Sequence, residues 1–199
     1  MIHPQTQLRY INDQLGYGVF ATAVIPIGTI VYVQDGLDAV IPPDSPLLQL
    51  PLVRAQIEKY AVIEPPDGQR ILSWDIAKYV NHCCHANILS TGYGFEIAVQ
   101  DIQPDEELRD DYGLFNLTWD IDLICQHEDC RGCIKPVDFA AQVKQWDAQI
   151  QNALQHTLNA PQALLSLLDV QTTTALEHYL HTGEDYWSVQ RLRLEPQKG

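Results

Sequence analysis

The chain has 199 residues, which suits one domain of ordinary size with an added segment. Hydrophobic residues make up 46% of it and charged residues 19%, which excludes a disordered chain and allows a proper core. A net charge of −14 argues against direct binding of nucleic-acid phosphates, and it suits either a basic partner or simple solubility.

The sequence also bears on where the protein works. It has no run of eighteen apolar residues, so we expect no transmembrane helix and no membrane partner. Residues 1–14 lack the basic start and apolar stretch of a signal peptide, so we expect a cytoplasmic protein, or a nuclear one in a eukaryote. Five cysteines in two tight groups favour thiols or a metal site over a disulfide framework.

Short strands and loops are predicted for the first half of the chain. Apolar runs rich in β-branched and aromatic residues alternate with turn sequences such as Ile25-Pro26-Ile27-Gly28, which is typical of short strands. Four prolines between residues 35 and 51 predict a loop there. The predicted elements are strands at 18–24, 30–33 and 95–102 and a helix at 52–63, whereas residues 70–80 have no clean period.

Helices are predicted for the last third of the chain. Apolar residues recur there at helical spacing, which favours a helix that packs on the preceding strand-rich domain over a dimer seam or docking surface. Beyond Pro161, residues 163–170 and 175–181 predict further short helices. The apolar stripe consists of Phe139, Val143, Trp146, Ile150, Leu154 and Leu158.

A glycine motif near the start invites a wrong interpretation. Residues 16–21 fit the pattern G-x-G-x-x-A of dinucleotide-binding folds. That motif has this meaning only between an apolar strand and a helix. Here polar residues precede it, and Pro26 and Gly28 follow too soon for a helix, so the sequence argues against a dinucleotide-binding fold.

Three separated segments carry a more specific pattern. They are residues 16–28, residues 78–87 (KYVNHCCHAN) and residues 101–113 (DIQPDEELRDDYG). In this order and spacing they resemble the SET-domain family, whose segments read roughly G-x-G-x-x-A, R-F-I-N-H-S-C-x-P-N and D-I-x-x-G-E-E-L-x-x-D-Y. Each segment alone would suit an ordinary turn or strand, but the combination favours the family. The resemblance covers about residues 8–134.

The resemblance implies a fold and a domain plan. The fold would be mainly β, a β-clip-like arrangement of small curved sheets in which a pseudoknot-like crossing brings the second and third segments to one site. An α-helical C-terminal extension would follow. We expect a SET domain at 8–118, a post-SET-like cysteine segment at 119–135 and the helical extension at 136–199.

The resemblance also implies a cofactor, S-adenosylmethionine, and a catalytic residue, Tyr112. Methyl transfer to an amine depends mainly on positioning, and an aromatic channel lowers the pKa of a lysine so that it loses its proton. Glycines in the first segment would let the backbone approach the cofactor. The expected cofactor-binding residues are Gly16, Tyr17, Gly18, Tyr79, Asn81, His82 and Tyr112, and the expected substrate-pocket residues are Asp110, Tyr93 and Phe95.

One departure from the family pattern affects the pocket. Asp110 stands where many members carry Phe or Tyr, a position that helps to set the number of methyl groups added. A carboxylate there would make the pocket more polar and could hold the lysine ammonium. The degree of methylation therefore does not follow from the sequence.

The cysteines resemble the family's post-SET zinc motif, C-x-C-x4-C-R-G. The expected ligands of a structural zinc ion are Cys84, Cys125, Cys130 and Cys133. Leu123 occupies the place of the first cysteine, so His127 is an alternative fourth ligand. The other interpretation is a decayed site whose thiols are reduced and buried.

Together these features predict a protein-lysine N-methyltransferase. The substrate would be a protein with an accessible lysine in a basic segment, on a chromatin or other target. The alternative is a SET-like binding or scaffold module that is weakly active or inactive, for which Asp110 and the incomplete cysteine motif speak.

Overall fold

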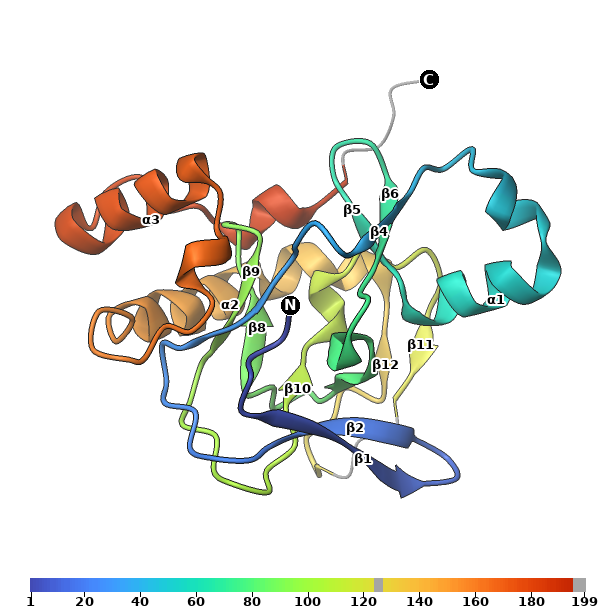
Figure 1. Cartoon of the computed structure of the whole chain (residues 1–199), viewed down its shortest axis with the longest axis horizontal. Coiled ribbons are helices and arrows are strands. Elements are labelled where there is room, and N and C mark those ends of the chain that lie inside the picture. Colours follow the sequence, from blue (N-terminus) through green and yellow to red (C-terminus); the bar gives the residue numbers. More distant parts are fainter. Residues whose placement is uncertain (124–126, 195–199) are drawn as a thin grey trace.

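The computed structural model of the protein describes residues 1–123 and 127–194 (Figure 1). Several small sheets form one part, and helices α2 and α3 cover one side of them. This agrees with the predicted mainly β fold with a helical C-terminal extension. None of the helices in the described residues is long and apolar enough to cross a membrane.

Within residues 1–123 and 127–194, five sheets make up the β part. Four are antiparallel, and the parallel one joins the second and third segments of the sequence pattern. In spatial order they are β1 (Thr6–Asn12) with β2 (Gly16–Ala21); β3 (Ile30–Val33), β9 (Phe95–Ala98) and β8 (Ile88–Ser90); β4 (Ala39–Ile41), β6 (Gln69–Leu72) and β5 (Val62–Glu64); β10 (Arg109–Asp110) with β7 (Asn81–His82); and β11 (Ile121–Asp122) with β12 (Cys133–Ile134).

The longer helices have clear sequence boundaries. A proline stands at the start of α1, and Asp169 caps α3 by accepting hydrogen bonds from the backbone N–H groups of Gln171 and Thr172. Gly183 ends α3 in the left-handed conformation. The helices are α1 (Pro51–Tyr60), α2 (Phe139–Leu154) and α3 (Val170–Thr182), with 3₁₀ turns at Pro46–Gln49, Ile76–Tyr79, Tyr112–Leu114, Pro136–Asp138, Leu165–Leu167 and Val189–Leu192.

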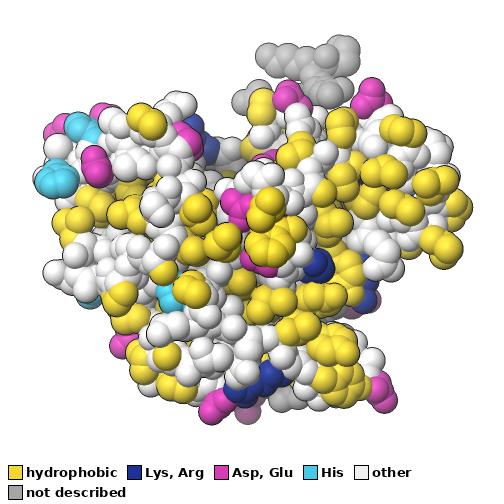
Figure 2. All heavy atoms as spheres, viewed as in Figure 1, with side chains coloured by type: hydrophobic (Ala, Val, Ile, Leu, Met, Phe, Trp, Pro, Cys, Tyr) yellow, Lys and Arg dark blue, Asp and Glu magenta, His cyan; other side chains and the backbone are white. Residues whose placement is uncertain are grey.

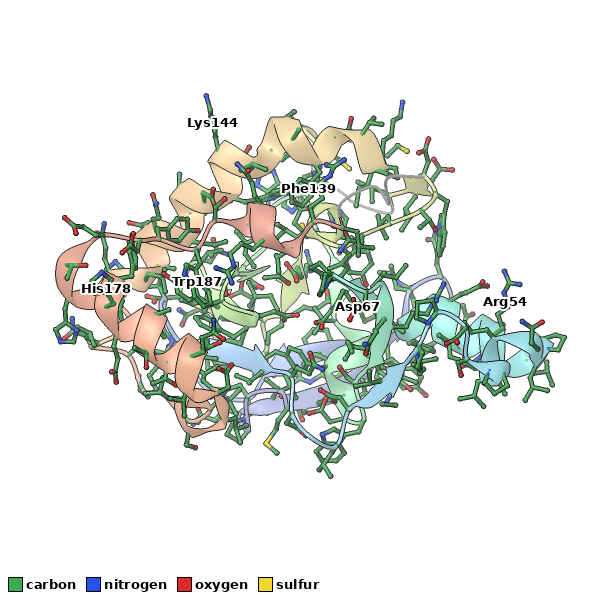
Figure 3. The ribbon with its side chains drawn as sticks, turned by 90° about the horizontal axis from the view of Figure 1, so that it is seen from above. Arg54, Asp67, Phe139, Lys144, His178 and Trp187 are labelled. Atoms are coloured by element: carbon green, nitrogen blue, oxygen red, sulfur yellow. The ribbon has the colours of Figure 1, made fainter. Side chains whose placement is uncertain are left out.

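The core consists of two hydrophobic clusters. The larger lies between the β3–β9–β8 sheet and helix α2, and includes Phe95, Ile97, Trp146 and Ile150. Side chains on the outer face of α2, such as Lys144, point away from the molecule (Figure 3). The prediction that this helix packs on the sheet domain is therefore confirmed.

The smaller cluster lies on the other side of the same sheet. It joins β2, β3 and β8 to Ile102 and Leu108 of the third segment. Helix α1, by contrast, stands out from the body, and hydrophobic side chains gather on the surface around it (Figures 1 and 2). Leu50 and Leu52 are 52% and 85% exposed there.

Several predicted boundaries were wrong. The strand predicted at 18–24 is β2, which ends at Ala21. Residues 35–51 are largely loop, as predicted, with only the short β4 and a 3₁₀ turn inside them. The helix predicted at 163–170 is only a 3₁₀ turn at Leu165–Leu167. Leu158 is 66% exposed because α2 ends at Leu154, one turn before it.

Candidate functional site

Gly18 lies where the three segments of the sequence pattern meet. Strand β2 pairs with the third segment through Leu108, whose N–H donates to the carbonyl of Val19, and β7 pairs in parallel with β10. A Cβ at Gly18 would clash with the carboxylate of Glu107 and would lie 3.1 Å from the side-chain nitrogen of Asn81. Glycine is required here because two other segments approach the backbone closely.

Asn81 connects these segments through hydrogen bonds. Its side-chain nitrogen donates to the carbonyl of Tyr17 at 3.0 Å and to Oε1 of Glu107 at 2.8 Å. The other oxygen of Glu107 accepts from Nε of Arg109 at 2.9 Å. The Glu107 carboxylate is largely buried with both oxygens occupied, so it fixes Asn81 in one orientation.

His82 is held as a neutral imidazole. Its Nδ1 accepts a hydrogen bond from the backbone N–H of Tyr112 at 3.2 Å, so the ring proton lies on Nε2, which is 3.6 Å from Sγ of Cys84. Burial lowers the pKa of His82 to about 4, although the nearby Asp111 opposes this shift. His82 therefore acts as a hydrogen-bonding link and carries no charge near neutral pH.

Tyr112 joins two sides of the site. Its hydroxyl donates to the carbonyl of Val80 at 2.7 Å, and its backbone N–H binds His82. Burial and the carboxylates of Asp110, Glu96 and Glu107 raise the pKa of its phenol, so the hydroxyl keeps its proton. Tyr112 and Val80 both line a cavity of about 340 Å³, and Asn81 is not among its lining residues.

The cavity is mostly apolar but contains carboxyl groups. Asp110 and Phe95, two of the predicted pocket residues, line it, as do Glu96 and Glu64. Its walls come from α1, β5, β9, the 3₁₀ turn at Tyr112–Leu114 and residues 115–119. The pocket therefore combines an aromatic wall with negative charge.

Tyr93, the third predicted pocket residue, lies elsewhere. It is 4% exposed, and its ring stacks on that of Trp187 with centroids 5.2 Å apart. It is absent from the cavity walls because it belongs to the core under the C-terminal segment, where Trp187 faces inward (Figure 3). Phe95, two residues later, contributes both to that core and to the cavity wall.

The predicted cofactor residues outside the cavity form an open surface beside Asn81. Gly16 has a φ of +75°, and a Cβ added to it would meet nothing within 4 Å. The ring of Tyr17 is 48% exposed and lies edge-on to that of Tyr79 with centroids 5.9 Å apart. Accessible backbone, two aromatic rings and the Asn81 amide fit a nucleoside-containing cofactor.

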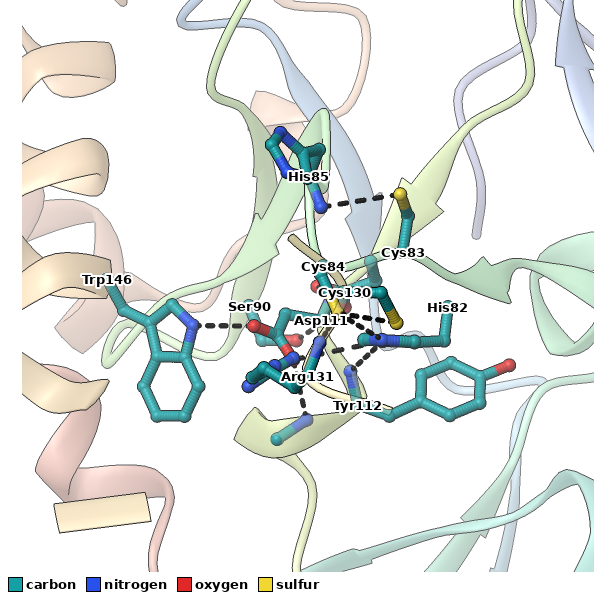
Figure 4. A network of polar contacts seen from close by, with 12 residues as sticks. His82, Cys83, Cys84, His85, Ser90, Asp111, Tyr112, Cys130, Arg131 and Trp146 are labelled. Carbon is teal, nitrogen blue, oxygen red and sulfur yellow. Dashed lines mark hydrogen bonds and ion pairs between the residues drawn. The ribbon is translucent and has the colours of Figure 1, made fainter. Parts of the chain in front are cut away.

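Asp111, which the sequence analysis did not single out, holds the site to the C-terminal helices (Figure 4). Its Oδ1 accepts from Gly113 N–H and from Nη2 of Arg131, and its Oδ2 accepts from Nε1 of Trp146 at 2.9 Å. Asp111 is 5% exposed and Trp146 is 2% exposed, so this network is shielded from water. Helix α2 thereby fixes the segment that carries Tyr112.

Two of the predicted zinc ligands, Cys84 and Cys130, lie close together. Sγ of Cys84 and Sγ of Cys130 are 3.7 Å apart, about the separation of two thiolates on one tetrahedral zinc ion (~3.8 Å for Zn–S bonds of ~2.3 Å). Backbone N–H groups of Arg131 and Gly132 donate to these sulfur atoms. These two ligands fit zinc.

Of the other candidate ligands, Cys133 and His127 do not join this pair within the described residues. Cys125 lies outside the described residues, and Sγ of Cys133 faces the carbonyl of Ile134. His127, the alternative ligand, stacks on His85. Residues 1–123 and 127–194 contain no group of three or more metal-binding side chains, so zinc stays a prediction.

Comparison with known proteins identifies the domain. Residues 16–113 match the SET domain family, and this range includes all three segments of the pattern. No curated protein matches the chain significantly.

The solved structures that match this chain are only distantly similar to it. The methyltransferase domain of human histone-lysine N-methyltransferase SETMAR is 19% identical, with a TM-score of 0.44 over 68% of this chain and 58% of that domain. KRYPTONITE, solved with DNA, an H3(1-15) peptide and SAH, is 19% identical, with a TM-score of 0.46 over 65% of this chain and 29% of that protein. The chain thus spans less than two thirds of either solved chain. The match over residues 16–113 places the chain in the SET-domain family.

Proposed function

We propose that this protein transfers a methyl group from S-adenosylmethionine to a lysine side chain of a protein. The observation that carries this proposal is the position of Tyr112. Its backbone N–H is bonded to His82, the residue after Asn81, and its hydroxyl donates to the carbonyl of Val80, which lines the cavity together with Tyr112. Tyr112 would therefore stand between the methyl donor and the acceptor.

Each side of Tyr112 would have its own task. The backbone at Gly16, the rings of Tyr17 and Tyr79, and Asn81 would bind the cofactor, which supplies an electrophilic methyl group when bound. The lysine would enter the cavity, where the Tyr112 hydroxyl and the Val80 carbonyl would orient its amine in line with that methyl. A structural zinc ion on Cys84, Cys125 and Cys130 would hold the segment after Tyr112 in place.

The charge of the molecule suits a basic substrate segment. The net charge is −14, and four carboxyl-bearing residues line the cavity: Glu58, Glu64, Glu96 and Asp110. A lysine in a basic segment would be drawn to such a surface. KRYPTONITE was solved with a histone peptide, and a lysine-rich peptide is a reasonable first substrate class for this chain also.

The test is transfer of a tritium-labelled methyl group from S-adenosylmethionine to poly-L-lysine and to peptides with one lysine in basic or neutral flanks. Wild-type protein should label lysine, and Tyr112→Phe should lower kcat about 100-fold while cofactor affinity stays nearly unchanged. Tyr10→Phe, at an exposed tyrosine of β1, serves as the matched control and should keep the wild-type rate. Cofactor binding without label in any acceptor would leave a scaffold module and contradict the proposal.

A further inference from the structure

Glu96 is a carboxyl group in the cavity that the mechanism above does not use. Strand β9 alternates, so that Phe95 and Ile97 face the core under α2 while Glu96 faces the other side. On that side its cross-strand neighbours are Tyr32 in β3 and Ser90 in β8. These three polar residues form a row, and all three line the cavity that also contains Tyr112.

The neighbours of Glu96 have hydrogen-bond partners of their own. Tyr32 bonds to Asp38 and Ser73, and Ser90 donates to Oδ2 of Asp110 at 3.2 Å. Asp110 also accepts from the Asp111 N–H. No hydrogen bond among the described residues ends on the carboxylate of Glu96, which leaves it available to a ligand in the cavity.

We propose that the carboxylate of Glu96 binds the ammonium group of the substrate lysine and takes its proton before methyl transfer; this rests on the proposed function. An N–H bond of the ammonium breaks, an O–H bond forms on Glu96, and the electron pair stays on the nitrogen. That pair then forms the N–CH3 bond as the S–CH3 bond of the donor breaks. Glu96 later releases its proton to water.

The surroundings of Glu96 suit a proton acceptor near neutral pH. Burial raises the pKa of Glu96 to about 7; Asp75 raises it further, and the chain's N-terminal ammonium opposes the shift. Burial and the neighbouring Glu96 raise the pKa of Asp110 well above its usual value as well, because two carboxyl groups in one buried site do not both ionise readily. The titratable and charged groups that face Glu96 are Tyr32, Asp75, Asp110, Tyr112 and the amine of Met1, with Glu58, Glu64, Lys59 and Lys78 in the other cavity walls.

The experiment is the pH profile of kcat/KM between pH 5.5 and 10, with the acceptor peptide that takes most label. The kcat/KM of the wild-type protein should rise with pH, with an apparent pKa near 7. Glu96→Gln should be about 100-fold slower at pH 7.5, and should recover activity toward pH 10, where free lysine loses its proton unaided (pKa about 10.4). Glu96→Asp keeps the carboxylate and should keep a rise near neutral pH.

Glu177→Gln is the matched control, because it removes one carboxylate from the exposed face of α3, outside the cavity, and should keep the wild-type profile. An unchanged profile in folded Glu96→Gln, or a loss that is equal at every pH, would overturn the role of Glu96 while the methyltransferase proposal stands. Wild-type protein that labels no acceptor would instead overturn the proposed function, and the role of Glu96 with it.

Discussion

At the scale of single residues, the site depends on side chains that have no freedom to move. Glu107 occupies the space that a side chain at Gly18 would need, and it binds Asn81 and Arg109 at the same time. Substitution at any of these positions would disturb the others. The backbone of Tyr112 and the ring of His82 are linked in the same way.

Glu96 should lower the stability of the fold at neutral and alkaline pH. Its pKa is about 7 in the folded chain and 4.5 as the ordinary value, so the fold favours the neutral acid. The loss of folding stability caused by Glu96 is absent below pH 4.5, grows as the pH rises to 7 and is constant at higher pH. Glu96→Gln should therefore raise the free energy of unfolding by up to about 3 kcal/mol at pH 8 and by almost nothing at pH 4.5.

Urea unfolding of both proteins at the two pH values measures this difference. Equal stabilisation at pH 4.5 and pH 8 would mean that Glu96 ionises normally in the folded chain. A buried carboxylate that lowers stability is expected where the group serves the proposed reaction, because active sites often sacrifice stability for activity.

The sequence could predict some site residues and not others, for physical reasons. Asn81, His82 and Tyr112 stand in contiguous motifs, and the structure brings all three together. Glu96 stands in an apolar strand, where a single polar residue normally faces solvent. Only the walls supplied by β5, α1 and residues 115–119 turn that face into a cavity.

At the scale of elements, helix α2 supports the segment that carries Tyr112. The indole Nε1 of Trp146 donates to Asp111, and its ring lies against Gly113. Asp111 in turn holds Arg131. The 3₁₀ turn that begins at Tyr112 is thus fixed from the side of α2 and from the side of the cysteine segment.

Trp146→Phe should disturb both stability and activity. The change removes the hydrogen bond to a buried carboxylate and leaves a cavity, so the free energy of unfolding should fall by about 2–4 kcal/mol. Because Asp111 loses a partner, kcat should fall at least 10-fold at a temperature where the protein is folded. Urea unfolding and methyl transfer measure the two effects.

Ile150→Val on the same helix is the matched control for Trp146→Phe. Ile150 is fully buried in the same cluster, so this change should cost about 1 kcal/mol and leave kcat unchanged. If Trp146→Phe lost stability but no activity, helix α2 would support the fold without positioning Tyr112.

Elements with a strong local pattern were predicted best. The strand at 30–33 has the predicted bounds, and α2 begins at the predicted Phe139. The hairpin of β5 and β6 was missed, because its short strands form only through pairing with each other and with β4. The helix predicted at 163–170 fails because its apolar residues follow Pro161 closely and pack as a 3₁₀ turn.

At the scale of the whole molecule, one core connects the sheets to the C-terminal helices. The larger hydrophobic cluster includes residues of β3, β8, β9, α2 and α3. Val80 and Tyr112, which we propose to lie between the cofactor and the acceptor, both line the cavity and are joined by a hydrogen bond. The apolar stripe of α2 predicted that this helix packs on the sheets. The domain boundaries at 118 and 135 stay predictions.

The central claim is that the surface around Asn81 binds S-adenosylmethionine, and calorimetric titration tests it most directly. S-adenosylmethionine and its demethylated product should bind wild-type protein saturably at one site. Asn81→Ala should weaken binding at least 10-fold, because it removes the link between Tyr17 and Glu107, whereas Asn159→Ala, in the turn after α2, should not. Folded wild-type protein that binds neither compound, or binds them equally well without the Asn81 amide, would contradict this account of the site.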